Sequence, residues 1–238
     1  MGRLFCTGDI HAYFKRIREI KNWCEKMNTT KDDCLIVLGD LGANYWLDKR
    51  DNQVKEALQS LPITILAIHG NHEERPSNIS TYKYAISKKY GGLWYEYDYP
   101  SLLFLEDGEH IINKRRFLIA SGAYSIDKEF RLQQGHKWFK DEQMNEKTKE
   151  RLRRLIKRNN SFDYILSHTA PLNYEPRFLF LPMIDQSTVD KSMESYLQWV
   201  YDNIDQEVLK LYLFGHYHSD NLLDKKVRLV FNDIIELE

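Results

Sequence analysis

One pattern recurs along this sequence: a short apolar run ends and is followed at once by Asp, Asn or His, mostly through a glycine. The five instances are RLFCT before GDIH, CLIVL before GDLG, ITILAIH before GNHE, FDYIL before SH, and KLYLF before GHYH. Such runs predict buried strands. In open α/β sheets, ligands bind beyond the carboxyl ends of the strands, so we expect these five exits to converge on one site.

The remaining periodicity predicts an α/β protein with mixed sheets flanked by helices. Apolar spacings of three and four predict a helix over 13–27. Aromatic and β-branched residues with turn signals predict hairpins over 92–125. The segments VRLVF and IIEL are expected to form a closing hairpin. Further helices are expected over 51–60, 82–90, 142–158 and 188–201.

The 238 residues contain no repeat or Pro/Gly/Ser-rich linker, which indicates a single domain over 1–238. The 34 Lys and Arg balance 35 Asp and Glu, so composition argues against general attraction to nucleic acid or a membrane. No segment has the roughly 20 apolar residues of a membrane span, and no signal peptide is evident. Three cysteines, an odd number, are expected to be buried free thiols in a reducing, cytoplasmic setting.

The side chains at the exits are oxygen and nitrogen donors without a thiolate, a set that suits Mn²⁺, Zn²⁺ or Fe²⁺. They are Asp9, His11, Asp40, Asn71, His168, His216 and His218. Seven ligands are too many for one tetrahedral ion, but they serve two ions if one carboxylate bridges. Two divalent ions against two aspartates leave roughly two positive charges, which would attract a phosphate and acidify a water. Singly, each exit is a common motif, and GHYH alone could be two surface imidazoles; the full set indicates a metal site.

As a set, GDIH, GDLG, GNHE, SHTAP and GHYH resemble the calcineurin-like metallophosphoesterase family over residues 8–218. The resemblance implies a four-layered α/β/β/α sandwich with two mixed β-sheets and a dinuclear metal centre at its top edge. It implies that the first metal is held by Asp9, His11 and His218. It implies that the second is held by Asn71, His168 and His216, with Asp40 as the bridge.

His72 looks like the family's histidine that is not a ligand, which stabilises the transition state and protonates the leaving group. Many members read GDxxD after the second strand, and the later Asp supports this histidine in the protein Ser/Thr phosphatase branch, which reads GDxxDRG. Here the string is GDLGANYW, with Ala43 at that position. Asp48 or Glu73 could take its place. The difference argues against close kinship with the protein Ser/Thr phosphatases.

Three arginines are candidates for binding phosphate oxygens, because a guanidinium can donate two parallel hydrogen bonds. Arg131 lies in ASGAYSIDKEFRLQQGHKWFKDEQM, which is similar to a segment of some bacterial and phage members of the family. Arg75 follows GNHE, and Arg177 lies in the NYEPRF loop. The alternative is that each is a solvated arginine. The apolar stretch within LNYEPRFLFLPMIDQS could form a lid or a partner surface.

The sequence thus predicts a phosphate-ester hydrolase in which two metal ions activate a hydroxide, with Mn²⁺ favoured and Fe or Zn as alternatives. A monoester of a small nucleotide or phosphoprotein is the first substrate prediction, and a phosphodiester of a nucleotide or nucleic acid is the second. A non-catalytic protein-binding scaffold is the third possibility, but such a protein is expected to lose ligands or His72, and all are present. The expected partner is a phosphorylated substrate and not a membrane; nucleic acid and oligomeric state stay open.

Overall fold

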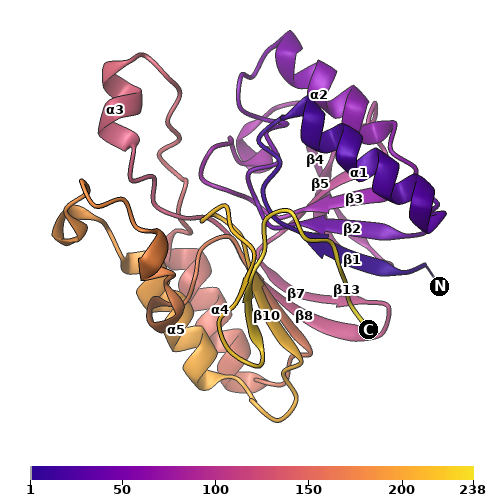
Figure 1. Cartoon of the computed structure of the whole chain (residues 1–238). Coiled ribbons are helices and arrows are strands. Elements are labelled where there is room, and N and C mark those ends of the chain that lie inside the picture. The colour runs from indigo at the N-terminus through magenta and orange to yellow at the C-terminus, as the bar shows by residue number, and fades with distance from the viewer. Residues whose placement is uncertain (1) are drawn as a thin grey trace.

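The computed structural model describes residues 2–238, which form two β-sheets and flanking helices (Figure 1). The strands of the first sheet are β1 (Leu4–Thr7), β2 (Cys34–Val37), β3 (Thr64–Ala67), β4 (Lys83–Ser87), β5 (Gly91–Tyr95), β6 (Leu102–Leu105) and β13 (Ile235–Glu236). Those of the second are β7 (Gly108–Ile112), β8 (Arg115–Ala120), β9 (Tyr164–Ser167), β10 (Leu211–Phe214), β11 (Asn221–Leu222) and β12 (Val227–Leu229). The helices are α1 (Phe14–Met27), α2 (Lys49–Gln59), α3 (Lys128–Gln133), α4 (Glu146–Arg158) and α5 (Ser192–Asn203). Short 3-10 turns are η1 (Pro76–Asn78), η2 (Leu172–Tyr174), η3 (Arg177–Leu179) and η4 (Gln186–Thr188).

Both sheets are mixed. The first has the order β13-β1-β2-β3-β6-β5-β4, and the second has the order β11-β12-β10-β9-β8-β7. The central strands β1, β2, β3 and β6 are parallel, as are β8, β9, β10 and β12, with antiparallel strands at the edges. Parallel neighbours end at the same edge, which places several carboxyl ends together.

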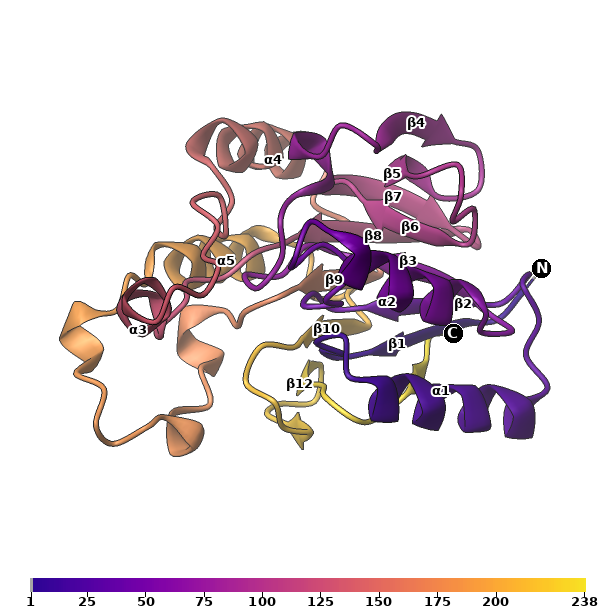
Figure 2. The ribbon, with the colours of Figure 1, turned by 90° about the horizontal axis from the view of Figure 1, so that it is seen from above.

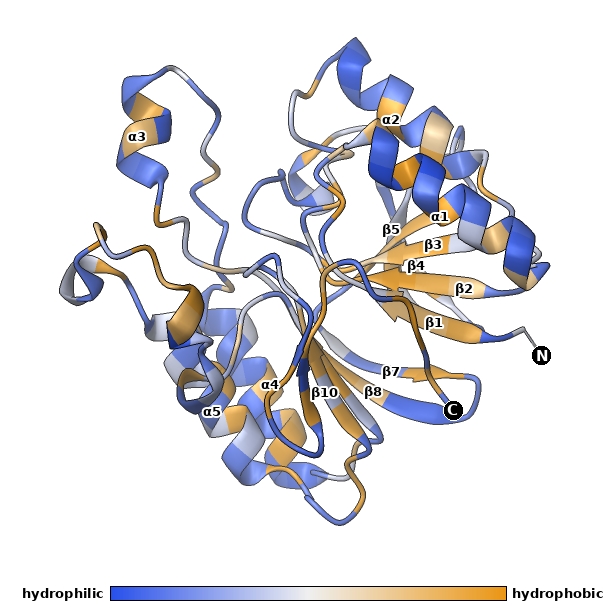
Figure 3. Cartoon of the chain, in the orientation of Figure 1, coloured by the Kyte–Doolittle hydropathy of each residue, from blue (hydrophilic) through white to orange (hydrophobic). Residues whose placement is uncertain are grey.

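Along each central strand, side chains point alternately to the flanking helices and to the other sheet, and this alternation produces the layers of the fold. In β2, Leu35 and Val37 pack with α1 and α2, whereas Cys34 and Ile36 face the second sheet. Successive strand side chains point to opposite faces, so a strand buried on both sides is expected to be largely apolar, as β2 is (Figure 3). Residues from α4 and α5 cover the outer face of β8, β9 and β10 in the same way. Figure 2 shows the result from above, and the predicted α/β/β/α sandwich is confirmed.

The prediction of a helix over 82–90 is wrong. The segment forms β4, a turn, and then β5, which pairs antiparallel with it through Tyr84 opposite Trp94. The run KYAIS alternates large and small residues and is mostly exposed, with Ile86 81% accessible. A segment this short is compatible with both the helical and the strand period, so its sequence does not distinguish the two. Pairing with β5 decided that it forms a strand.

The prediction that VRLVF and IIEL form a closing hairpin is also wrong. β12 joins the second sheet beside β10, whereas β13 crosses over and pairs with β1 of the first sheet. The turn between them is organised by Asp220, whose carboxylate accepts hydrogen bonds from the backbone N–H groups of Phe231, Asn232 and Asp233 at 2.8–3.0 Å. A side chain outside the segment therefore fixes the turn, which no local pattern in the segment indicates.

Two segments project beyond the sheets on the same side of the molecule (Figures 1 and 2). We call residues 124–140, which include α3, the first arm. Residues 172–191, which include η2, η3 and η4, are the second arm. The short helix α3 was not expected from the sequence. No helix within residues 2–238 combines the length and apolar character needed to cross a bilayer. The three cysteines are buried and free, as expected.

Candidate metal centre

The strand exits converge, and hydrogen bonds join exits that are far apart in the sequence. Asp9, after β1, accepts a hydrogen bond from the backbone N–H of His216, after β10, at 3.0 Å. His168, after β9, donates through Nδ1 to the carbonyl of Leu38, after β2, at 2.6 Å. The strand exits of both sheets therefore lie together, as the sequence predicted.

Glycines at the exits leave room for the carboxylates. A Cβ added at Gly215 would lie 2.3 Å from Asp9 Oδ1, and one at Gly70 would lie 2.0 Å from Asp40 Oδ1. Both distances are far below van der Waals contact. Glycine is required at these positions because any side chain would occupy the space of an acidic group in the site.

Four of the candidate ligands have left-handed backbone conformations. Their φ angles are 51° for His11, 48° for Asp40, 69° for His216 and 50° for His218. Each such residue costs on the order of 1–2 kcal/mol for an L-amino acid. The sharp bend turns each side chain back over the strand ends, and strain of this kind gathers at functional sites, where surrounding structure holds it in place.

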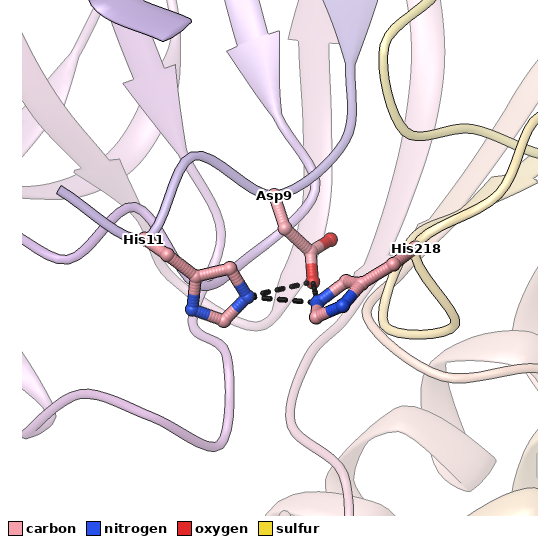
Figure 4. A group of neighbouring side chains, drawn as sticks. All are labelled: Asp9, His11 and His218. Atoms are coloured by element: carbon pink, nitrogen blue, oxygen red, sulfur yellow. Dashed lines mark hydrogen bonds and ion pairs between the residues drawn. The ribbon is translucent and has the colours of Figure 1, made fainter. Parts of the chain in front are cut away.

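The first group of candidate ligands is Asp9, His11 and His218 (Figure 4). The Nε2 atoms of His11 and His218 lie 2.8 Å apart. Asp9 Oδ2 lies 3.2 Å from His218 Nε2 and 3.5 Å from His11 Nε2. That oxygen is buried and has no hydrogen-bond partner within residues 2–238. Two imidazole nitrogens and a carboxylate oxygen at these distances can converge on one cation, so this group fits a metal ion.

The second group lies around His168. Its Nδ1 donates to the Leu38 carbonyl, and its Nε2 lies 2.8 Å from Asn71 Oδ1. Asn71 is oriented by Ser125, whose Oγ accepts a hydrogen bond from Asn71 Nδ2 at 2.8 Å. A metal ion that replaces the Nε2 proton would be bound by both Nε2 and Oδ1. Sequence reasoning missed Ser125, because nothing local in SGAYS indicates a partner 54 residues away.

Asp40 lies between the two groups. Its Oδ2 is 3.6 Å from His11 Nε2 and 3.5 Å from His168 Nε2. Its Oδ1 accepts a hydrogen bond from the backbone N–H of His72 at 2.8 Å. His216 is near, with its ring centroid 5.1 Å from that of His168, but it contributes no atom to the tight groups found among residues 2–238.

Mutual charge sets the protonation of these buried groups. Burial alone would raise the pKa of Asp9 and of Asp40, but the surrounding imidazoles lower both, so the carboxylates stay ionised. Burial would lower the pKa of His168, but the charges of Asp40 and Asp9 raise it to about 9. Burial and the neighbouring His168 lower the pKa of His216 to about 3. The site therefore holds fixed negative charge that a cation can neutralise.

His72 has an unexpected neighbour. Neither expected carboxylate contacts it: Asp48 binds Arg50, and Glu73 accepts hydrogen bonds from backbone N–H groups. Instead, Arg131 from α3 contacts His72 Nδ1 through Nη2. A guanidinium can only donate, so Nδ1 accepts and the ring proton lies on Nε2. Burial lowers the pKa of His72, and the Arg131 charge adds to this against the opposing effect of Asp40.

The other two candidate arginines lie elsewhere. Arg75 Nε donates to the carbonyl of Asp141 at 2.9 Å, and its Nη1 lies 3.3 Å from Asp107 Oδ2. It lines none of the hollows that contain candidate ligands in the described part of the chain. Arg177 is exposed on the second arm. Of the three arginines, Arg131 is the one brought to the metal centre.

Three hollows of the described residues contain candidate ligands, and His218 lines two of them. The arm-side hollow, of about 380 Å³, is lined by both arms together with Asp40, Asn71 and His72. The α1-side hollow, of about 520 Å³, is lined by Asp9, His11 and the start of α1.

Comparison with known proteins agrees with this architecture. The calcineurin-like phosphoesterase family model matches residues 2–220. The protein TT1561 of Thermus thermophilus superposes with a TM-score of 0.50 and 11% identity, covering 97% of this chain and 89% of that one. A novel archaeal phosphodiesterase superposes with a TM-score of 0.36 and 11% identity, covering 96% of this chain and 82% of that one. No curated protein sequence matches this chain.

The structural likeness at this identity shows the fold, and the family match spans all five strand exits. The family is one of metal-dependent phosphoester hydrolases. The chain therefore belongs to the calcineurin-like phosphoesterase family.

Proposed function

We propose that this chain hydrolyses phosphate esters at a dinuclear metal centre. The observation that carries the proposal is the position of Asp40 Oδ2, at 3.5–3.6 Å from an imidazole of each ligand group, where one carboxylate can serve two ions. The first ion would be held by Asp9, His11 and His218, and the second by Asn71, His168 and His216. When bound, the ions would acidify a water for attack on phosphorus and polarise the phosphoryl oxygens.

The protein's own groups would complete the reaction. His72, with its proton on Nε2, would donate a hydrogen bond to the departing alcohol oxygen and stabilise the negative charge that develops there, and that oxygen would take its proton from solvent water. Arg131 would hold the ring in this tautomer, and Asp127 would in turn orient Arg131 through a hydrogen bond of 2.8 Å. The role of Arg131 is then to position His72, in place of the direct phosphate contact expected from the sequence.

A monoester of a small nucleotide or phosphoprotein is our first candidate substrate. A phosphodiester of a nucleotide or nucleic acid is the second, and it is favoured by the two hollows that meet at His218, since a diester carries a substituent on each side of the phosphorus. We propose Mn²⁺ as the resident ion, with Fe or Zn as alternatives, and a reducing, cytoplasmic location consistent with the three buried thiols.

The test begins with chelator-treated protein to which Mn²⁺, Zn²⁺ or Fe²⁺ is returned. Release of nitrophenol from 4-nitrophenyl phosphate is compared with release from bis(4-nitrophenyl) phosphate, and metal content is measured in parallel. We expect about two ions per chain and hydrolysis that depends on them. Binding of two ions without hydrolysis of either ester would favour the scaffold, and faster cleavage of the diester would establish the second candidate.

A further inference from the structure

The arm-side hollow combines the metal centre with apolar side chains from both arms. Its lining includes Asp40, Asn71 and His72 of the metal centre and Phe180 and Leu181 of the second arm. Its volume of about 380 Å³ lies within the ~300–1,000 Å³ typical of small-molecule sites. A group bonded to a phosphate at the metal centre could extend directly into this space.

A pair of aromatic side chains, Phe180 and Tyr217, lines the hollow. Phe180 stacks on Tyr217, with ring centroids 6.3 Å apart and an angle of 20° between the planes. Tyr217 follows the ligand His216 directly, so the aromatic pair is tied to the metal centre through the backbone. Lys191 Nζ lies 4.8 Å from the Phe180 ring centroid and 2.5 Å from Glu175 Oε1, so an ammonium held by a carboxylate packs against the ring and keeps it in place.

A polar group with free hydrogen-bonding capacity also lines the hollow. Glu194 of α5 is only 4% exposed, and its Oε1 accepts a hydrogen bond from Thr169 Oγ1 at 2.8 Å. Its Oε2 is buried and has no partner among residues 2–238. A buried oxygen of this kind is unfavourable unless a bound molecule or water satisfies it. The hollow thus combines an apolar, aromatic lining with one buried carboxyl group that has an unused hydrogen-bonding position among residues 2–238.

We infer that the arm-side hollow binds the leaving group of the substrate, and that this group carries an aromatic ring with a hydrogen-bonding edge. The inference rests on the proposed phosphoesterase function and narrows its substrate class. A nucleobase and the phenol ring of a phosphotyrosyl group share this chemistry. In both cases the ring packs against Phe180, and the polar edge pairs with Glu194.

The test compares phosphate esters with and without the ring. Adenosine 5′-monophosphate and ribose 5-phosphate have the same primary phosphate ester and differ in the base. Their inhibition constants are measured against hydrolysis of a nitrophenyl ester by the Mn²⁺-loaded protein. We expect the nucleotide to bind about tenfold tighter or more, the range that base stacking on an aromatic side chain supports. O-phosphotyrosine, measured alongside, distinguishes the two sources of the ring.

Matched variants locate the effect. Phe180→Ala should bring the two inhibition constants to within about threefold, whereas Phe178→Ala should leave their ratio unchanged. Phe178 lies on the same arm but is 65% exposed and does not line the hollow. Leu181→Ser, at a half-exposed position in the wall, is a second variant that should reduce the ratio less.

Equal inhibition constants in the parent protein, or equal losses in Phe178→Ala and Phe180→Ala, would overturn the inference. The proposed function fails separately, if no ester is hydrolysed with any ion. In that case the same ratio of affinities is obtained by calorimetric titration of the Mn²⁺-loaded protein, so the inference is still decided.

Discussion

At the strand exits, Asp9, Asp40 and His168 are almost completely buried, and each forms a hydrogen bond with a backbone group that follows a different strand. On the second arm, Phe178 is 65% exposed and Met183 is 82% exposed, and the chain makes only short 3-10 turns. The exits combine strained backbone with dense packing, whereas the arms have little of either. The difference fits the division of labour that we propose, in which the exits would hold the ions and the arms would select the group attached to phosphate.

The largest effect is expected at the residue shared by both ligand groups. Asp40→Asn removes the charge that would bridge the ions while preserving the shape of the side chain. We expect ester hydrolysis to fall to the metal-free background and metal content to fall with it, as measured by nitrophenol release and elemental analysis. Full activity in this variant would mean that the exits do not hold the reactive centre.

A smaller loss is expected at His72, which touches both regions because its ring contacts Arg131 of the first arm. His72→Ala should lower kcat by about 10²–10⁴ with metal content unchanged. Arg131→Gln should lower kcat less, by about 10–100-fold, as for other residues that orient a functional group. If Arg131→Gln costs as much as His72→Ala, the arm takes part in the chemistry itself and the division fails.

Paired glycine substitutions compare the two regions directly. Gly215→Ala places a methyl group 2.3 Å from Asp9 Oδ1, so Asp9 must move, and we expect metal affinity to fall by about 10–100-fold. Gly135→Ala, at the end of α3, meets nothing within 4 Å and is the control. Its positive φ of 69° costs roughly 1 kcal/mol of stability but should leave metal affinity unchanged. Titration with Mn²⁺ measures the metal affinity of both variants.

The smallest effect is expected for an exposed apolar residue of the second arm. Met183→Ser should change the free energy of unfolding by no more than about 0.5 kcal/mol, because the side chain is already 82% exposed. Thermal unfolding with and without Mn²⁺ provides the measurement. A destabilisation of several kcal/mol would show that the arm is part of the folded core and not an appendage to it.

Local signals explain why the exits could be predicted. A glycine beside a buried strand, followed by Asp, Asn or His, is contained within a few residues, and strand direction then brings such segments to one edge. The contacts that were missed connect distant segments. Ser125 with Asn71, Arg131 with His72, and Asp220 with the turn before β13 each depend on packing that has no local signature.

The sequence by itself determined the layers and the residues at the strand ends, because periodicity decides which faces are buried and glycine decides where a carboxylate can fit against a neighbouring strand. Only the tertiary structure decided which groups face one another: two sets of side chains that could each hold a cation, an arginine in the place expected for a carboxylate, and a hollow with an aromatic lining between two arms. Those relations depend on distances between segments far apart in the chain, and the energy of a contact is defined only once both partners are in place.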